Sequence, residues 1–152
     1  MRHRREKRPP KHQEEVAPEN IWAVTASSDY KWPAAWIACP SNVLDLDETT
    51  MWNARTFAPA WIRFDLGPSA PCVTRLELLP SMKPTEGEIE HQIQMGTSLC
   101  NMSTAVTING KGGDREWIVC RLPQSRRTRF LEVLTTRSPS WVAWVRIRIW
   151  VE

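Results

Sequence analysis

The sequence predicts an all-β domain, a sandwich or jelly roll of about eight short antiparallel strands. Apolar and polar residues alternate in short runs, which is the pattern of a strand with one buried face. Turn residues such as Asn109-Gly110 and Ser138-Pro139-Ser140 separate these runs, and no run shows the period of a long amphipathic helix. A chain of 152 residues is long enough to bury one sizeable core.

The expected strands follow one another from residue 20 onward. Ile21 to Ala26 is the first, and alternation is clearest in Trp61 to Leu66 and Val73 to Leu79. Five further runs complete the set: 90–95, 103–108, 116–122, 129–135 and 144–151. The regular spacing of the runs and turns is typical of antiparallel sheets joined by short connections.

Tryptophan is unusually frequent, with nine Trp against one Tyr and three Phe. Because Trp is large and half polar, we expect some of these rings at a surface where stacking is useful. The segment from Ser27 to Pro40 interrupts the strand spacing and contains Tyr30, Trp32 and Trp36. It is predicted to be an aromatic loop, and long loops on a rigid sandwich are common places for binding.

Positive charge is concentrated at the N-terminus. The net charge is +3, and residues 1–15 hold six of the 20 basic groups and three of the 17 acidic ones, so the remainder is neutral. We therefore divide the chain into a disordered, basic, proline-containing arm, residues 1–19, and a folded domain, residues 20–152. The arm could dock on an acidic partner or be a solvated tail. A neutral domain argues against nucleic acid as a partner.

The cysteines and the N-terminus bear on metal binding and location. Cys39, Cys72, Cys100 and Cys120 form no Cys-x-x-Cys pair and do not cluster with histidine, which argues against a zinc site. Their even number would permit two disulfides, whereas four reduced thiols would be typical of an intracellular protein. We find no apolar run of signal-peptide length and no transmembrane segment, so we expect a cytoplasmic or virion location.

Two adjacent motifs stand out: the acidic turn Asp45 to Trp52, which follows Ala26-Ser27-Ser28, and the strand Trp61 to Gly67. Together they resemble the signature of the discoidin, or coagulation-factor type C, domain. Arg129 to Val133 and the final strand, 138–149, continue the resemblance in the same order. The resemblance covers roughly residues 20–152 and implies a galactose-binding-like jelly roll of two facing antiparallel sheets. It also implies a binding module that is not an enzyme.

We interpret the residues of these motifs as structural. Asp45, Asp47 and Thr50 can hydrogen-bond within their own turn, and Trp52 can fold beneath the turn as a plug. Asp65 and Gly67 end a strand, and glycine adopts a positive φ there without steric cost.

The resemblance also implies a structural calcium ion, held between the acidic turn and a Glu of the final strand. The corresponding position in this chain is Arg146. A cation in place of a hard oxygen ligand should abolish or weaken such a site, so we expect no metal and no other cofactor. We predict instead that Arg146 pairs with Asp45 or Asp47 as a side-chain substitute for the metal.

In the family, ligands meet the loops at one end of the sandwich. A sugar site needs a flat aromatic ring for the pyranose face and polar groups for the hydroxyls. Trp32, Trp36 or Trp141 could supply the ring. The polar candidates lie in the loop after Trp52 and in the segment from Ser81 to His91, and they are Asn53, Arg55 and His91.

Two other interpretations of these residues stay open. A lipid surface would instead be met by Trp32 and Trp36 with basic residues beside them, here Lys31 and Lys83. A structural role would place Trp141 in the core and would make the lone His91 a buried residue.

The leading functional hypothesis is a non-catalytic module that recognises carbohydrate through these loops. We recognise no paired catalytic carboxylates, no Ser/His/Asp arrangement and no phosphate-binding loop. The alternative is a structural or assembly protein that uses the same fold for protein–protein contacts, because Trp also concentrates at interfaces. Such a protein could be a phage or virion decoration or fibre-attachment component or an intracellular scaffold, as a homo-oligomer or part of a larger assembly.

Overall fold

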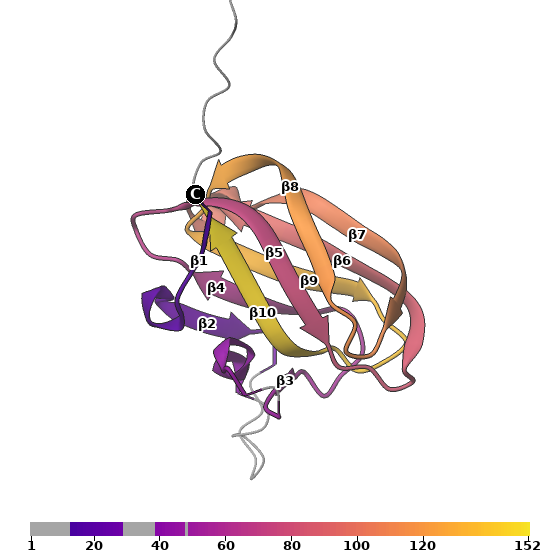
Figure 1. Cartoon of the computed structure of the whole chain (residues 1–152). Coiled ribbons are helices and arrows are strands. Elements are labelled where there is room, and N and C mark those ends of the chain that lie inside the picture. The colour runs from indigo at the N-terminus through magenta and orange to yellow at the C-terminus, as the bar shows by residue number, and fades with distance from the viewer. Residues whose placement is uncertain (1–12, 29–38, 48) are drawn as a thin grey trace, which may run out of the picture.

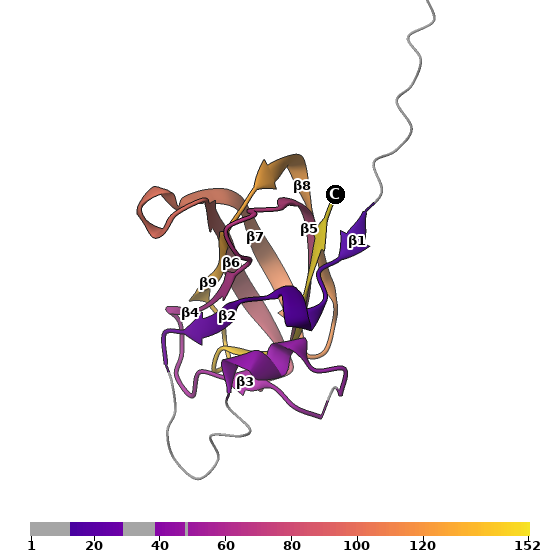
Figure 2. The same ribbon diagram turned by 90° about the vertical axis from the view of Figure 1, so that its left-hand side faces the viewer.

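The computed structural model describes residues 13–28, 39–47 and 49–152, and these form two antiparallel sheets packed face to face (Figure 1). One sheet consists of β1 (Glu14–Glu15), β10 (Ala143–Val151), β5 (Cys72–Pro80) and β8 (Ile118–Arg127) in that order, with β3 (Trp52–Asn53) also paired to β10. The other consists of β2 (Ala23–Ala26), β4 (Ala60–Asp65), β9 (Phe130–Arg137), β6 (Glu86–Gly96) and β7 (Ser103–Gly113). In Figure 2 the two sheets lie on opposite sides of the core.

The predicted all-β sandwich is confirmed. The described residues form ten strands rather than about eight, because β1 and β3 have two residues each and are too short to produce an alternating pattern. Three short 3₁₀ helices complete the described structure: η1 (Pro18–Asn20), η2 (Pro40–Leu44) and η3 (Leu99–Asn101). Within the same ranges, no helix is long and apolar enough to cross a membrane.

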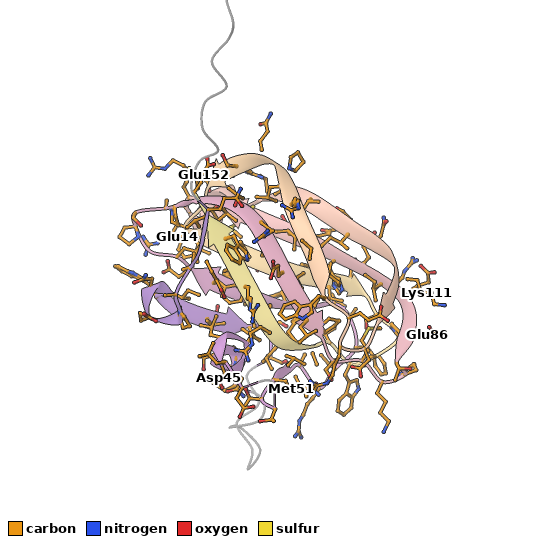
Figure 3. The ribbon with its side chains drawn as sticks, viewed as in Figure 1. Glu14, Asp45, Met51, Glu86, Lys111 and Glu152 are labelled. Atoms are coloured by element: carbon orange, nitrogen blue, oxygen red, sulfur yellow. The ribbon has the colours of Figure 1, made fainter. Side chains whose placement is uncertain are left out.

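The folded domain begins earlier than predicted. Glu14 and Glu15 of β1 pair with the end of β10, and the backbone N–H of Val16 donates to the Ile149 carbonyl at 2.8 Å. Figure 3 shows Glu14 and Glu152 at the same end of the molecule. Residues 14–19, which the charge pattern assigned to the arm, are therefore part of the sandwich. Glu14 and Glu15 pair with the last strand of the chain, so no local pattern could reveal this contact.

Alternation along each strand places the core between the sheets. In β4, Ile62 and Phe64 are fully buried, whereas Arg63 faces outward, stacks on Trp61 and pairs with Glu132 at 2.7 Å. Among the described residues, Trp52 and Trp144 are the largest fully buried side chains. Burial of Trp52 agrees with its predicted role as a plug.

The turn after β4 has the expected geometry. β4 ends at Asp65, and Gly67 adopts a φ of +86°, which a side chain would strain. The Asp65 carboxylate accepts the Gly67 N–H at 2.8 Å and lies 3.1 Å from the Arg129 guanidinium. Burial alone would raise the pKa of Asp65, but the hydrogen bonds from Arg129 and Gly67 outweigh it and lower that pKa. The motif therefore fixes the end of a central strand.

Candidate functional site

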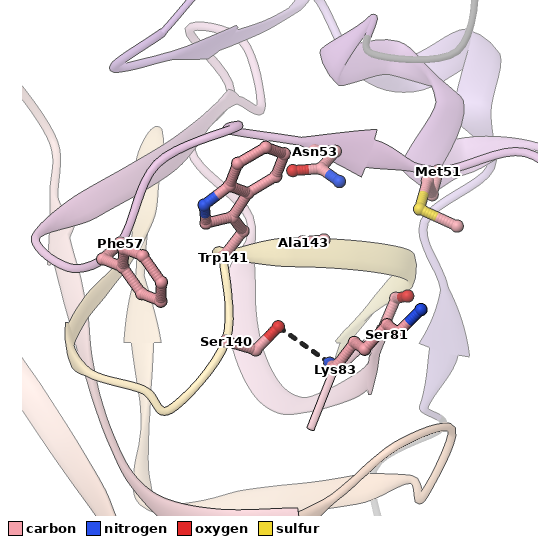
Figure 4. A pocket seen from close by; sticks show the side chains of 8 residues that line it. All are labelled: Met51, Asn53, Phe57, Ser81, Lys83, Ser140, Trp141 and Ala143. Atoms are coloured by element: carbon pink, nitrogen blue, oxygen red, sulfur yellow. Dashed lines mark hydrogen bonds between the residues drawn. The ribbon is translucent and has the colours of Figure 1, made fainter. Parts of the chain in front are cut away.

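An open pocket of about 460 Å³ lies at one end of the sandwich (Figure 4). Its volume falls in the range of roughly 300–1,000 Å³ that is usual for small-molecule sites. Three segments far apart in the sequence form it: the β3 region, the end of β5 with the loop that follows, and the turn that leads into β10. The lining residues are Met51, Asn53, Phe57, Ser81, Lys83, Ser140, Trp141 and Ala143.

Two exposed aromatic rings line one side of this pocket. Trp141 is 46% exposed and Phe57 is 58% exposed, and Figure 4 shows them on the same side of the opening. Because large apolar rings are usually buried, two of them exposed in one hollow indicate a contact surface. Trp141 is therefore not a core residue, which was the structural alternative for it.

The polar groups of the pocket come from different strands and loops. Asn53 lies in β3 opposite Ala143 of β10, and its side-chain oxygen accepts the Arg55 backbone N–H at 2.8 Å. Figure 4 shows its amide between Trp141 and Met51. Lys83 is exposed, and its backbone N–H donates to the hydroxyl of buried Ser140 at 2.9 Å.

Main-chain hydrogen bonds hold the three segments together. Val142, next to Trp141, accepts the Ala54 N–H at 2.8 Å and donates to the Thr56 carbonyl at 3.0 Å. The Ser81 N–H donates to the Ala143 carbonyl at 3.1 Å. The pocket wall is thus fixed by backbone contacts to the start of β10, which reduces the ordering cost of binding.

The structure brings three of the seven candidate ligand residues together: Asn53, Lys83 and Trp141. Arg55 lies on the same loop, between Asn53 and Phe57, but does not line the pocket. Trp32 and Trp36 lie outside the described residues. The sequence pattern did not point to Met51 and Ala143, which also line the pocket. Only the pairing of β3 with β10 brings them together there.

The expectation that His91 hydrogen-bonds a ligand at a surface loop is wrong. His91 lies within β6, is 4% exposed, and its Nδ1 is 2.8 Å from the Thr135 hydroxyl oxygen. The cavity that it lines beneath Trp141 holds about 10 Å³, too little for a sugar ring. Burial lowers the pKa of His91 to about 4, so the ring is neutral at pH 7.

The acidic turn is a separate feature at this end of the molecule, near Met51 (Figure 3). Asp47 accepts the Thr49 N–H at 2.9 Å, and the Thr50 hydroxyl lies 3.0 Å from an Asp45 carboxylate oxygen. The hydrogen bonds from Thr49 lower the pKa of Asp47, and the positive charge of Arg146 contributes as the smallest cause. This effect is consistent with the prediction that Arg146 lies near the acidic turn. A direct ion pair between Arg146 and Asp45 or Asp47 stays a prediction.

The described residues around the acidic turn disfavour a calcium ion, and the absence of calcium there stays a prediction. Arg146 is 3% exposed, and its charge acts on the turn, so a divalent cation there would be repelled. Oxygens of Asp45 and Asp47 already accept hydrogen bonds within the turn. Among the described residues, no group of three or more His, Cys, Asp or Glu could hold a metal ion.

Calcium is therefore expected to leave the stability of the protein unchanged. Thermal unfolding with excess calcium and with a chelator should give Tm values that differ by less than about 1 °C, because a ligand stabilises only a fold that binds it. Magnesium at equal concentration controls for ionic strength. A calcium-specific rise of several degrees would contradict the prediction that Arg146 replaces the metal.

Comparisons with known proteins identify the fold. No protein-family model matches the chain, and no curated protein matches it. The family 32 carbohydrate-binding module of NanJ from C. perfringens, solved with galactose, superimposes with a TM-score of 0.74 at 11% identity, over 91% of this chain and 99% of that one. The module CpGH89CBM32-5 from Clostridium perfringens, solved with GalNAc-β-1,3-galactose, gives 0.75 at 14% identity over 90% and 99%.

A third solved structure is also similar. The family 32 module of AlyQ, in complex with 4,5-unsaturated mannuronic acid, gives a TM-score of 0.69 at 21% identity, over 85% of this chain and 94% of that one. The chain therefore has the galactose-binding-like, discoidin-type fold that its sequence motifs imply.

Proposed function

We propose that this protein is a non-catalytic carbohydrate-binding module that holds a sugar in the pocket beside Trp141. One observation carries the proposal: a half-exposed Trp141 shares an open pocket with polar side chains held on fixed segments. The structural neighbours are carbohydrate-binding modules with the same fold, which supports a binding role for the chain.

The arrangement suits the two faces of a sugar. The apolar C–H face of a pyranose can stack on the indole of Trp141, with Phe57 extending the apolar surface. The amide of Asn53 and the hydroxyl of Ser81 can then exchange hydrogen bonds with sugar hydroxyls. Because the pocket is open to solvent, it can admit one unit of a longer chain.

The chemistry of the lining supports binding without catalysis. Among the described residues that line the pocket, none is a carboxylate or an imidazole. Glycoside cleavage usually requires a pair of carboxylates that flank the scissile bond. We therefore assign the pocket to recognition alone.

A panel of oligosaccharides tests the proposal with the full-length chain. Isothermal titration should detect saturable binding of at least one sugar at micromolar to millimolar concentration, accompanied by a change in Trp fluorescence. Light scattering on the same samples tests the assembly alternative. Stable oligomers that bind no sugar of the panel would contradict the proposal and favour assembly.

A further inference from the structure

The lining of the pocket beside Trp141 carries a positive charge. Lys83 is the one charged side chain among the described residues that line it. Among the described residues, none of the ion pairs involves Lys83. A pocket with one cation and no lining carboxylate favours a negatively charged ligand.

We propose that the pocket selects an acidic sugar unit, with Lys83 bound to its carboxylate or sulfate group. This inference rests on the proposed function and narrows it to a class of sugar. Trp141 would hold the ring, and the ammonium group of Lys83 would form a charge-assisted hydrogen bond to the anionic substituent.

The placement of Lys83 suits this role. Figure 4 shows Ser81 and Lys83 across the pocket from Phe57 and Trp141. Trp141 and Lys83 line the same pocket, so a sugar stacked on Trp141 would share that pocket with the Lys83 side chain. A lysine, with a flexible stem and a compact charge, can reach an anion at several positions of such a ring.

The backbone beneath Lys83 is fixed although its side chain is exposed. Its N–H is bonded to Ser140 Oγ, and the N–H of buried Met82 donates to an Asp114 carboxylate oxygen at 2.7 Å. Asp114 thereby ties down the segment and does not line the pocket. Binding of an anion needs to order only the side chain of Lys83.

The same arrangement disfavours cationic sugars. A protonated amino sugar would meet a like charge at Lys83 and no lining carboxylate to offset it. Because Lys83 is exposed, its attraction for an anion should weaken as added salt screens it. Stacking on Trp141 should change far less with salt.

The test compares oligosaccharides that differ in charge: oligogalacturonate, neutral galacto-oligosaccharide, a sulfated galactan fragment and a chitosan oligomer. At low salt we expect at least one of the two acidic sugars to bind about tenfold tighter than the neutral one, with most of this preference lost in 0.5 M NaCl. The affinities of oligogalacturonate and of the sulfated galactan fragment show whether a carboxylate or a sulfate is preferred.

Two matched variants complete the test. Lys83→Met should weaken binding of the acidic sugar about fivefold more than it weakens binding of the neutral sugar. Lys111→Met is the control, because exposed Lys111 lies beside Glu86 at 3.5 Å and away from Met51 of the pocket (Figure 3). Equal loss in both variants would overturn the role of Lys83.

The outcomes separate this inference from the proposed function. If the neutral or cationic sugar binds best, the preference for acidic sugars is wrong and the carbohydrate-binding role stands. If no sugar of any charge binds, the proposed function itself fails. A preference for an acidic sugar that Lys83→Met removes for the most part supports both.

Discussion

Replacing Trp141 with alanine is expected to weaken sugar binding by about 30- to 100-fold. Truncation of a central aromatic contact typically costs at least about 2 kcal/mol of binding free energy, and 1.4 kcal/mol corresponds to about tenfold in affinity. Trp141 is half exposed, so its removal opens no core cavity and the fold should persist. Trp141→Phe keeps a flat ring and should lose less.

Trp117→Ala is the matched control for this experiment. Trp117 has a similar exposure, 39%, but it lies before β8, contacts Arg148 and does not line the pocket. Titration calorimetry with the best oligosaccharide of the panel measures each variant, and circular dichroism verifies folding. Unchanged affinity in Trp141→Ala would place the sugar site elsewhere, and an equal loss in Trp117→Ala would indicate a nonspecific effect.

Acidification from pH 6.5 to about pH 4 is expected to remove about 3 kcal/mol of unfolding free energy through His91 alone. Burial lowers the pKa of His91 from 6.5 to about 4 in the folded protein. In this window the unfolded chain binds a proton that the folded chain does not, so the unfolded state gains stability. The contribution is fully present above pH 6.5 and lost by about pH 4.

Urea denaturation at a series of pH values measures this contribution. His91→Gln should be less stable at pH 7 but lose less stability between pH 6.5 and pH 4, since glutamine does not ionise. Carboxylates titrate in both proteins, so the difference between the two curves isolates His91. Thr135→Val removes the hydrogen-bond partner of His91 and should keep the wild-type slope, because burial causes the shift. Parallel curves for wild type and His91→Gln would show that His91 does not cause this loss of stability.

The fold class could be predicted because its evidence is local. Alternation in 61–66 assigns Ile62 and Phe64 to the core, since successive side chains of a strand point to opposite faces. Likewise, the Asp65-Leu66-Gly67 turn requires one residue with positive φ, and the sequence supplies glycine there. Neither prediction depends on knowing which strands are neighbours.

The positions of His91 and of residues 14–19 could not be predicted in this way. The expected strand 90–95 already included His91, but β6 begins at Glu86 because its first residues pair with the end of β7. This extension places His91 well inside the strand and not at the end of a ligand-binding loop. The sequence places Glu14 and Glu15 in a charged arm, whereas in the structure they pair with β10. Both outcomes follow from partners far along the chain.

The sequence by itself determined an all-β sandwich, its acidic turn and the aromatic and polar residue types available for binding. Only the tertiary structure decided which of them meet: Asn53, Lys83 and Trp141 share a pocket, whereas His91 lies in the core. The physical reason is that burial alternates residue by residue along a strand, while a pocket depends on the register between strands. Here β3 and β5 both pair with β10, and that pairing brings the three segments of the pocket together.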